Sequence, residues 1–400
     1  MTPAERRAAQ SLTAIFALRM LGLFLVLPVF ALEAHKYPGG DNGMLVGLTM
    51  GIYGLTQAVL QAPLGLASDR WGRKRVIVAG LLVFAAGSAL AALAGSLPQL
   101  LLGRALQGAG AVSAAVTALL ADLTRDRVRT KGMALVGMSI GLTFALSLMI
   151  SPPLTAWVGL RGLFWLTAAL ALGGIAVVLL WTPPEPRQHA GLPRGKLSQV
   201  WLHPQLWRLD LGVFALHAVQ MSMWVVVPGL LEKAGLPEAA QWHLYLPVVL
   251  ASFVLLGGLF AAERRGRLRA VWRGAIALLL LVQLALWALA PRAPGVWALG
   301  AVMFFFFAAF NILEASQPSM VSRLAPVHAR GAALGVYNTM QSLGLFAGGA
   351  LGGALLKGFG PAAVFAATAL LTLAWLLLGW GQPMPQTPPP ASPAPAPSPD

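Results

Sequence analysis

The sequence predicts an all-α membrane protein with twelve transmembrane helices, arranged as two parallel six-helix repeats. Of the 400 residues, 58% are hydrophobic and only 10% are charged, and the mean hydropathy is +0.74. Soluble domains carry roughly 25% charged residues. The hydrophobic residues also form repeated runs of about 20, the length that crosses a hydrocarbon core. Finally, the basic residues alternate between the two sides that these runs define.

Breaks that are charged or rich in Gly and Pro separate the apolar runs. Within lipid each run must be a helix, because a helix satisfies its backbone hydrogen bonds inside one segment. The first run is too long for a signal-peptide core and shows no cleavage site, so it is expected to remain as the first helix. The predicted spans are 11–34, 44–66, 76–96, 98–121, 131–153, 161–181, 206–230, 241–262, 271–290, 295–318, 329–356 and 361–381.

The formal net charge of +15 follows the topology of these helices. If the N-terminus is cytoplasmic, 21 of the 28 Lys and Arg residues lie in inside segments and 5 in outside segments, while Arg19 and Arg104 lie within helices. Such a bias is what the positive-inside rule requires. We therefore expect a multi-pass protein of the plasma (inner) membrane with both termini in the cytoplasm. The charge does not indicate a nucleic-acid partner.

A long break divides the chain into two halves. Residues 182–205 contain five prolines and are expected to form a cytoplasmic linker between an N-terminal six-helix bundle, 1–181, and a C-terminal six-helix bundle, 206–381. Residues 382–400 are rich in Pro, Ala and Ser, and they lack the apolar content needed to fold. We expect them to be a disordered tail.

The two halves carry related loops. Asp69-Arg70-Trp71-Gly72-Arg73 follows the second helix, and Glu263-Arg264-Arg265-Gly266-Arg267 follows the eighth, which is the matching position in the second half. Parallel six-helix repeats with a substrate site between them describe one large class of transporters.

Polar side chains are concentrated in particular helices. The third, sixth and twelfth helices carry no charged or amide side chain in their cores, and the ninth carries only Gln283. Charge inside a membrane is costly and tends to line substrate or ion pathways. We therefore expect the first, fourth, seventh and tenth helices to surround a hydrated cavity and the third, sixth, ninth and twelfth to face lipid.

The loop after the second helix, residues 65–75, reads GLASDRWGRKR and fits the pattern GxxxDRxGRKx in full. This pattern resembles the cytoplasmic signature of the major facilitator superfamily. An acid beside fixed cations can form an ion pair that breaks and re-forms, whereas a simple positive-inside loop explains neither the acid nor the glycines. The resemblance implies a switch that locks the cytoplasmic side in the outward-open state, built from Gly65, Asp69, Arg70, Gly72, Arg73 and Asp122.

The fourth helix contains Arg104 and Gln107 within LLGRALQGAG, which resembles the RxxQGxG motif of proton-coupled members of this superfamily. Because an arginine stays protonated, it would act in coupling by pairing with or repelling a titratable group. The alternative is that Arg104 snorkels to the outer surface.

Two further helices resemble those of drug-exporting members. The first helix contains Arg19-Met20-Leu21-Gly22, similar to a motif of exporters with twelve helices. The fifth helix resembles an antiporter motif, but Ser151 stands where Gly is expected. Close packing of small residues explains this helix equally well. Some drug/proton antiporters have a soluble domain after the last helix, and here only the Pro-rich tail is expected.

Two titratable residues near the middle of the membrane are the candidates for proton coupling, together with Arg104. His217 titrates near neutral pH unless burial shifts it, and the alternative is a neutral His bonded to a neighbouring helix. Glu314 must be protonated, paired or hydrated, and a purely structural pairing is the alternative. Glu33 and Asp210 lie near helix ends, where solvation at the interface explains them.

The expected substrate cavity combines cationic, amide and aromatic side chains. Ordinary core packing is the alternative for the aromatic ones. The candidates are Arg19, Phe24, Tyr53, Gln57, Gln107, Gln220, Trp224, Asn311, Asn338 and Gln341.

These features predict a secondary active transporter. Family likeness favours proton-coupled efflux (antiport) of a small molecule, with lipophilic compounds as one class, by rocker-switch alternating access. The alternatives are a proton symporter or facilitator that imports a metabolite, and a receptor or scaffold. An enzyme is disfavoured, because the sequence has no Cys, no HExxH and no paired intramembrane Asp. The expected partners are the substrate, protons and the lipid bilayer. We expect a monomer with no cofactor or metal.

Overall fold

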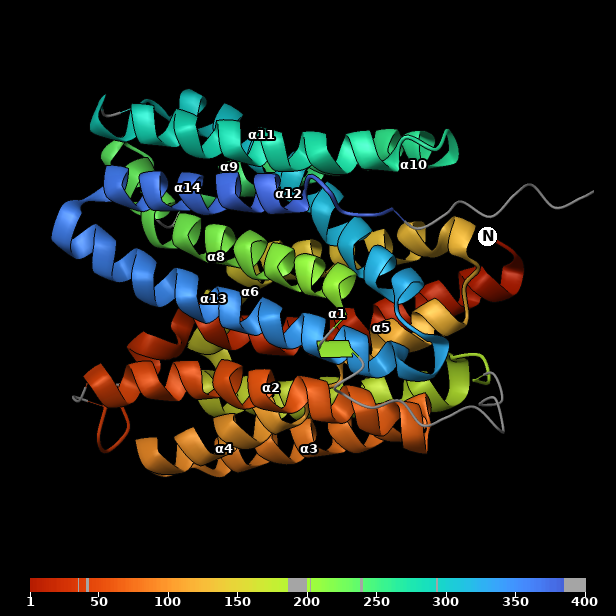
Figure 1. Ribbon diagram of the computed structural model, residues 1–400. Coiled ribbons are helices and arrows are strands. Elements are labelled where there is room, and N and C mark those ends of the chain that lie inside the picture. The colour runs from red at the N-terminus through yellow and green to blue at the C-terminus, as the bar shows by residue number, and fades with distance from the viewer. Residues whose placement is uncertain are drawn as a thin grey trace, which may run out of the picture.

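The computed structural model describes residues 1–34, 36–40, 43–185, 200–201, 203–237, 240–292 and 294–384, and these residues form helices and no strands. Long helices lie side by side, with the first half of the chain below the second in Figure 1. The first half contains α1 (Pro3–Ala34), α2 (Gly43–Trp71), α3 (Arg73–Leu93), α4 (Leu97–Ala109), α5 (Ser113–Asp122), α6 (Asp126–Ala176) and the π-helical turn η1 (Val177–Trp181).

The second half repeats this pattern. It contains α8 (Pro204–Lys233), α9 (Trp242–Val254), α10 (Leu256–Arg264), α11 (Leu268–Leu289), the short 3-10 turn η3 (Ala290–Arg292), α12 (Val296–Leu324), the 3-10 turn η4 (Val327–Ala329), α13 (Arg330–Phe359) and α14 (Pro361–Gly379).

In the described part of the chain, eleven helical stretches are long and apolar enough to cross a membrane. The helix α2 supplies a twelfth long helix, since its 29 residues extend about 43 Å at 1.5 Å per residue. The predicted all-α membrane fold is confirmed. Most of the predicted linker 182–205 and of the tail 382–400 lies outside the described residues.

Three predicted helices differ in detail from the structure. The fourth is interrupted between α4 and α5, and the eighth between α9 and α10 at Leu255. The predicted fifth and sixth helices are not separated by a loop, because helical structure runs on to Gly159. At Gly159 the backbone takes φ 66° and ψ 178°, a conformation that glycine adopts without steric penalty. One residue therefore makes the break between these helices.

The surface carries the apolar side chains that a bilayer would cover. More than half of the side chain is exposed for Leu93 at the end of α3, Leu180 in η1, Leu281 in α11 and Leu370 in α14. These residues belong to the third, sixth, ninth and twelfth membrane helices, but Val59 of α2 and Leu102 of α4 are exposed to a similar degree, so exposure does not set those four helices apart.

The two halves meet along two seams. In one, α2 packs along α13 and α5 joins it (Figure 1), while in the other α6 packs against α12 and α9. We call the end of the molecule where α2 ends and α13 begins the inner end, because the sequence predicts that it faces the cytoplasm.

Candidate functional site

Small residues bring α2 and α13 into backbone contact at the inner end. A Cβ added at Gly65 would overlap the carbonyl oxygen of Gly331, and one added at Gly335 would overlap Ala62. Because glycine has no side chain, the backbones approach more closely here than any other residue allows. The seam between the halves is therefore closed at this end.

Asp69 connects the two halves across this seam. Its two carboxylate oxygens accept hydrogen bonds from the backbone N–H of Gly331 (2.9 Å) and Ala332 (2.7 Å), in the first turn of α13. A carboxylate at a helix N-terminus satisfies unpaired N–H groups and interacts favourably with the helix dipole. Only 3% of the Asp69 side chain is exposed. An acid of the first half thus caps a helix of the second half.

Arg73 and Asp122 extend this contact. The Arg73 guanidinium pairs with Asp69 (Nη1 to Oδ1, 2.6 Å) and with Asp122 (Nε to Oδ2, 3.0 Å). Asp122 also forms an ion pair with Arg330, at the start of α13. The structure thereby brings together three of the predicted switch residues and adds Arg330. We call Asp69, Arg73, Asp122 and Arg330 the first clamp.

The remaining switch residues have other positions. Arg70 is exposed and makes no recorded polar contact among the described residues. Gly72 adopts φ 97°, which favours glycine, at the turn between α2 and α3. Glu185 accepts hydrogen bonds from the backbone N–H of Arg73 (2.8 Å) and Lys74 (3.2 Å), and so caps α3.

A second clamp, formed by Glu263, Arg323 and Thr130, occupies the matching position on the other seam. Glu263 follows the eighth membrane helix as Asp69 follows the second, and it pairs with Arg323 of α12. The Thr130 hydroxyl of α6 donates to Glu263 (2.9 Å) and accepts from Arg323 (3.0 Å). In both clamps, the loop acid of one half therefore contacts the beginning of a helix from the other half.

A polar group lies near the middle of the second half. The Nε2 atom of His217 lies 3.5 Å from Oε2 of Glu314, and Gln341 lies 2.7 Å from the same nitrogen and 3.4 Å from Oε1 of Glu314. These residues come from α8, α12 and α13. His217 is 3% exposed, and Glu314 is partly exposed (18% of its side chain). We call these three residues the central group.

Two buried arginines occupy the first half. Arg19 donates to Ser113 Oγ (3.0 Å), Tyr53 OH (2.9 Å) and Gln57 Oε1 (2.9 Å). Arg104 donates to Gln107 and lies over the Tyr53 ring. Each arginine is 1% exposed. Within the described residues neither pairs with a carboxylate, and the buried Arg104 does not snorkel.

Replacing Arg19 with Lys is expected to destabilise the protein. A lysine keeps the charge, but its single ammonium cannot reach Ser113, Tyr53 and Gln57 at the positions that the planar guanidinium occupies. Loss of one or two charge-assisted hydrogen bonds costs about 2–4 kcal/mol. We expect a lower midpoint of thermal unfolding in detergent, whereas Arg70→Lys should unfold like the wild type. Equal midpoints for all three proteins would contradict this prediction.

An aromatic chain crosses between the halves. Phe24 of α1 contacts Phe144 of α6, which contacts Trp224 of α8, with ring centroids 5.2 Å apart in both pairs. Trp224 also packs against Tyr245 and Phe307. Sequence reasoning identified Phe24 and Trp224 but missed Phe144, which has no motif around it.

The other predicted cavity residues are dispersed. Gln107 bonds to Ser88 inside the first half, Asn338 bonds to the Leu334 carbonyl of its own helix, and Asn311 bonds to Ser252. Gln220 is partly exposed on α8. Among the described residues, none of these four forms a hydrogen bond with the central group.

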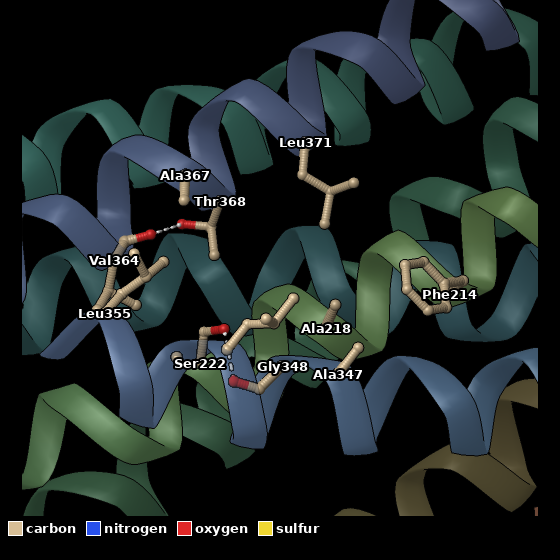
Figure 2. Close-up of a pocket in the computed structure, with 12 residues that line it drawn as sticks. Phe214, Ala218, Ser222, Ala347, Gly348, Leu355, Val364, Ala367, Thr368 and Leu371 are labelled. Atoms are coloured by element: carbon tan, nitrogen blue, oxygen red, sulfur yellow. Dashed lines mark hydrogen bonds between the residues drawn. The ribbon is translucent and has the colours of Figure 1, made fainter. Parts of the chain in front are cut away.

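A cavity of about 250 Å³ lies elsewhere, between α8, α13 and α14 (Figure 2). Its walls are almost entirely apolar. The hydroxyls of Ser222 and Thr368 in its lining donate to the Gly348 and Val364 carbonyls. It contains none of the predicted site residues. Within the described residues, no cluster of acidic and His side chains could hold a metal ion.

Comparisons with known proteins agree on one family. The model of the Major Facilitator Superfamily matches residues 12–349 and 260–400. The chain is 44% identical to inner membrane transport protein YajR of Escherichia coli K12, over 94% of this chain and 83% of that protein. It is 28% identical to multidrug resistance protein MdtH of Aeromonas salmonicida, over 84% of each. The crystal structure of the human organic anion transporter MFSD10 superposes with a TM-score of 0.77 at 20% identity, covering 94% of this chain and all of that one, and so shares the fold.

Proposed function

The chain belongs to the Major Facilitator Superfamily, so it is a membrane transporter and not an enzyme, and on this premise we propose that it exports a small molecule in exchange for protons. The observation that carries the proposal is the central group. A carboxyl and an imidazole lie 3.5 Å apart near mid-membrane. Both can bind and release protons, and an ionisable residue at such a depth is costly unless it serves transport.

The two clamps support rocker-switch alternating access as the mechanism. In the conformation described here, both clamps connect the halves at the inner end, which we take as cytoplasmic, with both termini on that side. Opening this side requires that Asp69 leave the first turn of α13 and that Glu263 leave Thr130. We propose that proton binding at Glu314 or His217 shifts the balance between the closed and open arrangements. Arg104, the third candidate for proton coupling, lies in the other half, where it bonds to Gln107.

The proposed cargo is lipophilic. Phe24 and Trp224, joined by Phe144, offer aromatic surface between the halves. The relative MdtH is named as a multidrug resistance protein. One proton crossing 100 mV supplies about 2.3 kcal/mol, in addition to any pH gradient, which is enough to concentrate such a compound. We expect a monomer to suffice.

Inverted inner-membrane vesicles with an acidic lumen test the direction of transport. Ethidium, as a lipophilic cation, and a naphthalene sulfonate, as a lipophilic anion, are suitable fluorescent probes. An antiporter is expected to accumulate a probe in the lumen as protons leave, and a protonophore should abolish the accumulation. Vesicles without the protein are the control. Movement of the probe out of the lumen together with protons would instead support the alternative, a proton symporter that imports its substrate.

A further inference from the structure

A second set of buried polar side chains lies between the central group and the inner end. Asp210, Gln317 and Tyr337 are 1%, 0% and 3% exposed. Their positions six or seven residues from the inner ends of α8, α12 and α13 place all three about 10 Å from that end. We call them the inner layer. The sequence suggested that Asp210 is solvated at the membrane interface, but the structure buries it.

The inner layer lies in register with the central group. On α8, Asp210 and His217 are seven residues apart and lie on the same face of the helix. Residues three or four apart also lie on one helix face, and α12 and α13 each contribute such a pair. The pair on α12 is Gln317 with Glu314, and the pair on α13 is Tyr337 with Gln341. Each of the three helices therefore contributes one residue to each layer.

The contacts support this register. Gln317 Oε1 and Trp375 Nε1 both lie against Gly212 of α8, where an added Cβ would approach them to 2.9 and 2.7 Å. The carboxylates of Asp210 and Glu314 both interact electrostatically with the buried Tyr337 phenol. The Tyr337 phenol is therefore near both carboxylates.

The polar atoms of the inner layer lack protein partners. Asp210 Oδ1, Tyr337 OH and both amide atoms of Gln317 are buried and make no hydrogen bond, and the same holds for Glu314 Oε2. Buried polar atoms are nearly always hydrogen-bonded, to protein or to ordered water. Such a concentration of unpaired atoms is typical of a site that water occupies.

We propose that Asp210 is the inner station of a hydrated proton path that runs past Gln317 and Tyr337 to Glu314 and His217. This inference rests on the proposed proton coupling. In each transfer during export, one O–H bond of Glu314 breaks and one forms on the Asp210 carboxylate through intervening water, and Asp210 then releases its proton at the inner end; the same steps run in reverse when the protein exchanges with bulk D₂O. The titratable group that interacts with Asp210 is Tyr337 on α13, and the next ones along the path are Glu314 on α12 and His217 on its own helix. The remaining neighbour, α14, has none among its 19 residues.

Infrared spectroscopy of the purified full-length protein in lipid tests this path without a substrate. Transfer into D₂O shifts the carbonyl band of a protonated carboxyl group, and the Glu314 band is the one lost in Glu314→Gln. In Asp210→Asn we expect deuteration of Glu314 to slow by about tenfold or more, as when a group that relays protons is removed. Asp210→Glu should keep the wild-type rate. The matched control is Glu232→Gln, an exposed carboxylate at the far end of the same helix.

Two results would overturn the path: an unchanged deuteration rate in Asp210→Asn, or no protonated Glu314 band at any pH. If Asp210→Asn unfolds, Tyr337→Phe serves as the second variant, and an unchanged rate there would also overturn it. The vesicle assay separates this inference from the proposed function. One combination of results is slower deuteration of Glu314 in Asp210→Asn than in the wild type, together with wild-type vesicles that move no probe in exchange for protons. That combination would refute proton-coupled export, but it would leave the proton path standing.

Discussion

Replacing Glu314 with Gln is expected to abolish pH-driven transport and to preserve ligand binding. Glutamine has nearly the shape of glutamic acid and can still bond to Gln341, but it cannot exchange a proton. Since general acid–base groups contribute at least about a hundredfold, we expect pH-driven accumulation of the fluorescent probe to fall by about that factor. Exchange of labelled for unlabelled probe across the membrane without a pH gradient should persist.

Three quantities are measured for Glu314→Gln: the pH-driven accumulation of the probe, the exchange of labelled for unlabelled probe, and the shift in melting temperature that bound probe produces. Glu232→Gln is the control, because it removes an exposed carboxylate from α8 outside the central group. His217→Ala should weaken coupling as well, since it removes the imidazole 3.5 Å from Glu314. Normal pH-driven accumulation in Glu314→Gln would mean that the central group does not carry the proton.

Replacing Asp69 with Asn is expected to open the inner end. The variant loses the ion pair with Arg73 and one of the two bonds to α13, while Arg73 stays buried. Removing one partner of a buried pair costs about 3 kcal/mol or more. Every 1.4 kcal/mol changes an equilibrium tenfold, so the open fraction should rise by about a hundredfold.

A thiol at the seam reports this opening. The chain has no cysteine, so Ala62→Cys provides a single reactive site on α2, buried against Gly335. We expect a membrane-impermeant maleimide to label it at least about tenfold faster in the Asp69→Asn background. The matched control is Asp126→Asn, whose carboxylate pairs with Arg129 three residues away in the same helix. Equal labelling rates in both backgrounds would show that Asp69 does not hold the seam closed.

Local sequence accounts for the helices and for part of the first clamp. The apolar runs fix the helices, because lipid leaves the backbone no other way to satisfy its hydrogen bonds. The loop motif contains Asp69 and Arg73, and the family resemblance implied Asp122; the structure brings the three together. The interruption at Gly110 was missed, since apolar content continues through it. The break between the fifth and sixth helices was predicted, but as a loop over 154–160 and not as the single residue Gly159.

Partners that are distant in the chain could not be predicted. Asp69 contacts Ala332, 263 residues away, and Glu263 contacts Thr130, 133 residues away. No local pattern pairs these positions until the two halves are docked. Asp210 was misjudged for a related reason. Its distance from the helix end suggested interfacial water, whereas Asp210 is buried on α8, which packs against α12, α13 and α14.

Pulsed electron resonance between two spin labels tests the central claim that protonation of the central group controls the inner end. The labels are attached to Arg127→Cys in the first half and Val327→Cys in the second, both exposed at the inner end. The wild type should show a short and a long distance whose populations change with pH, and Glu314→Gln should show populations that pH does not change. A single distance, identical at every pH and in both proteins, would contradict the account.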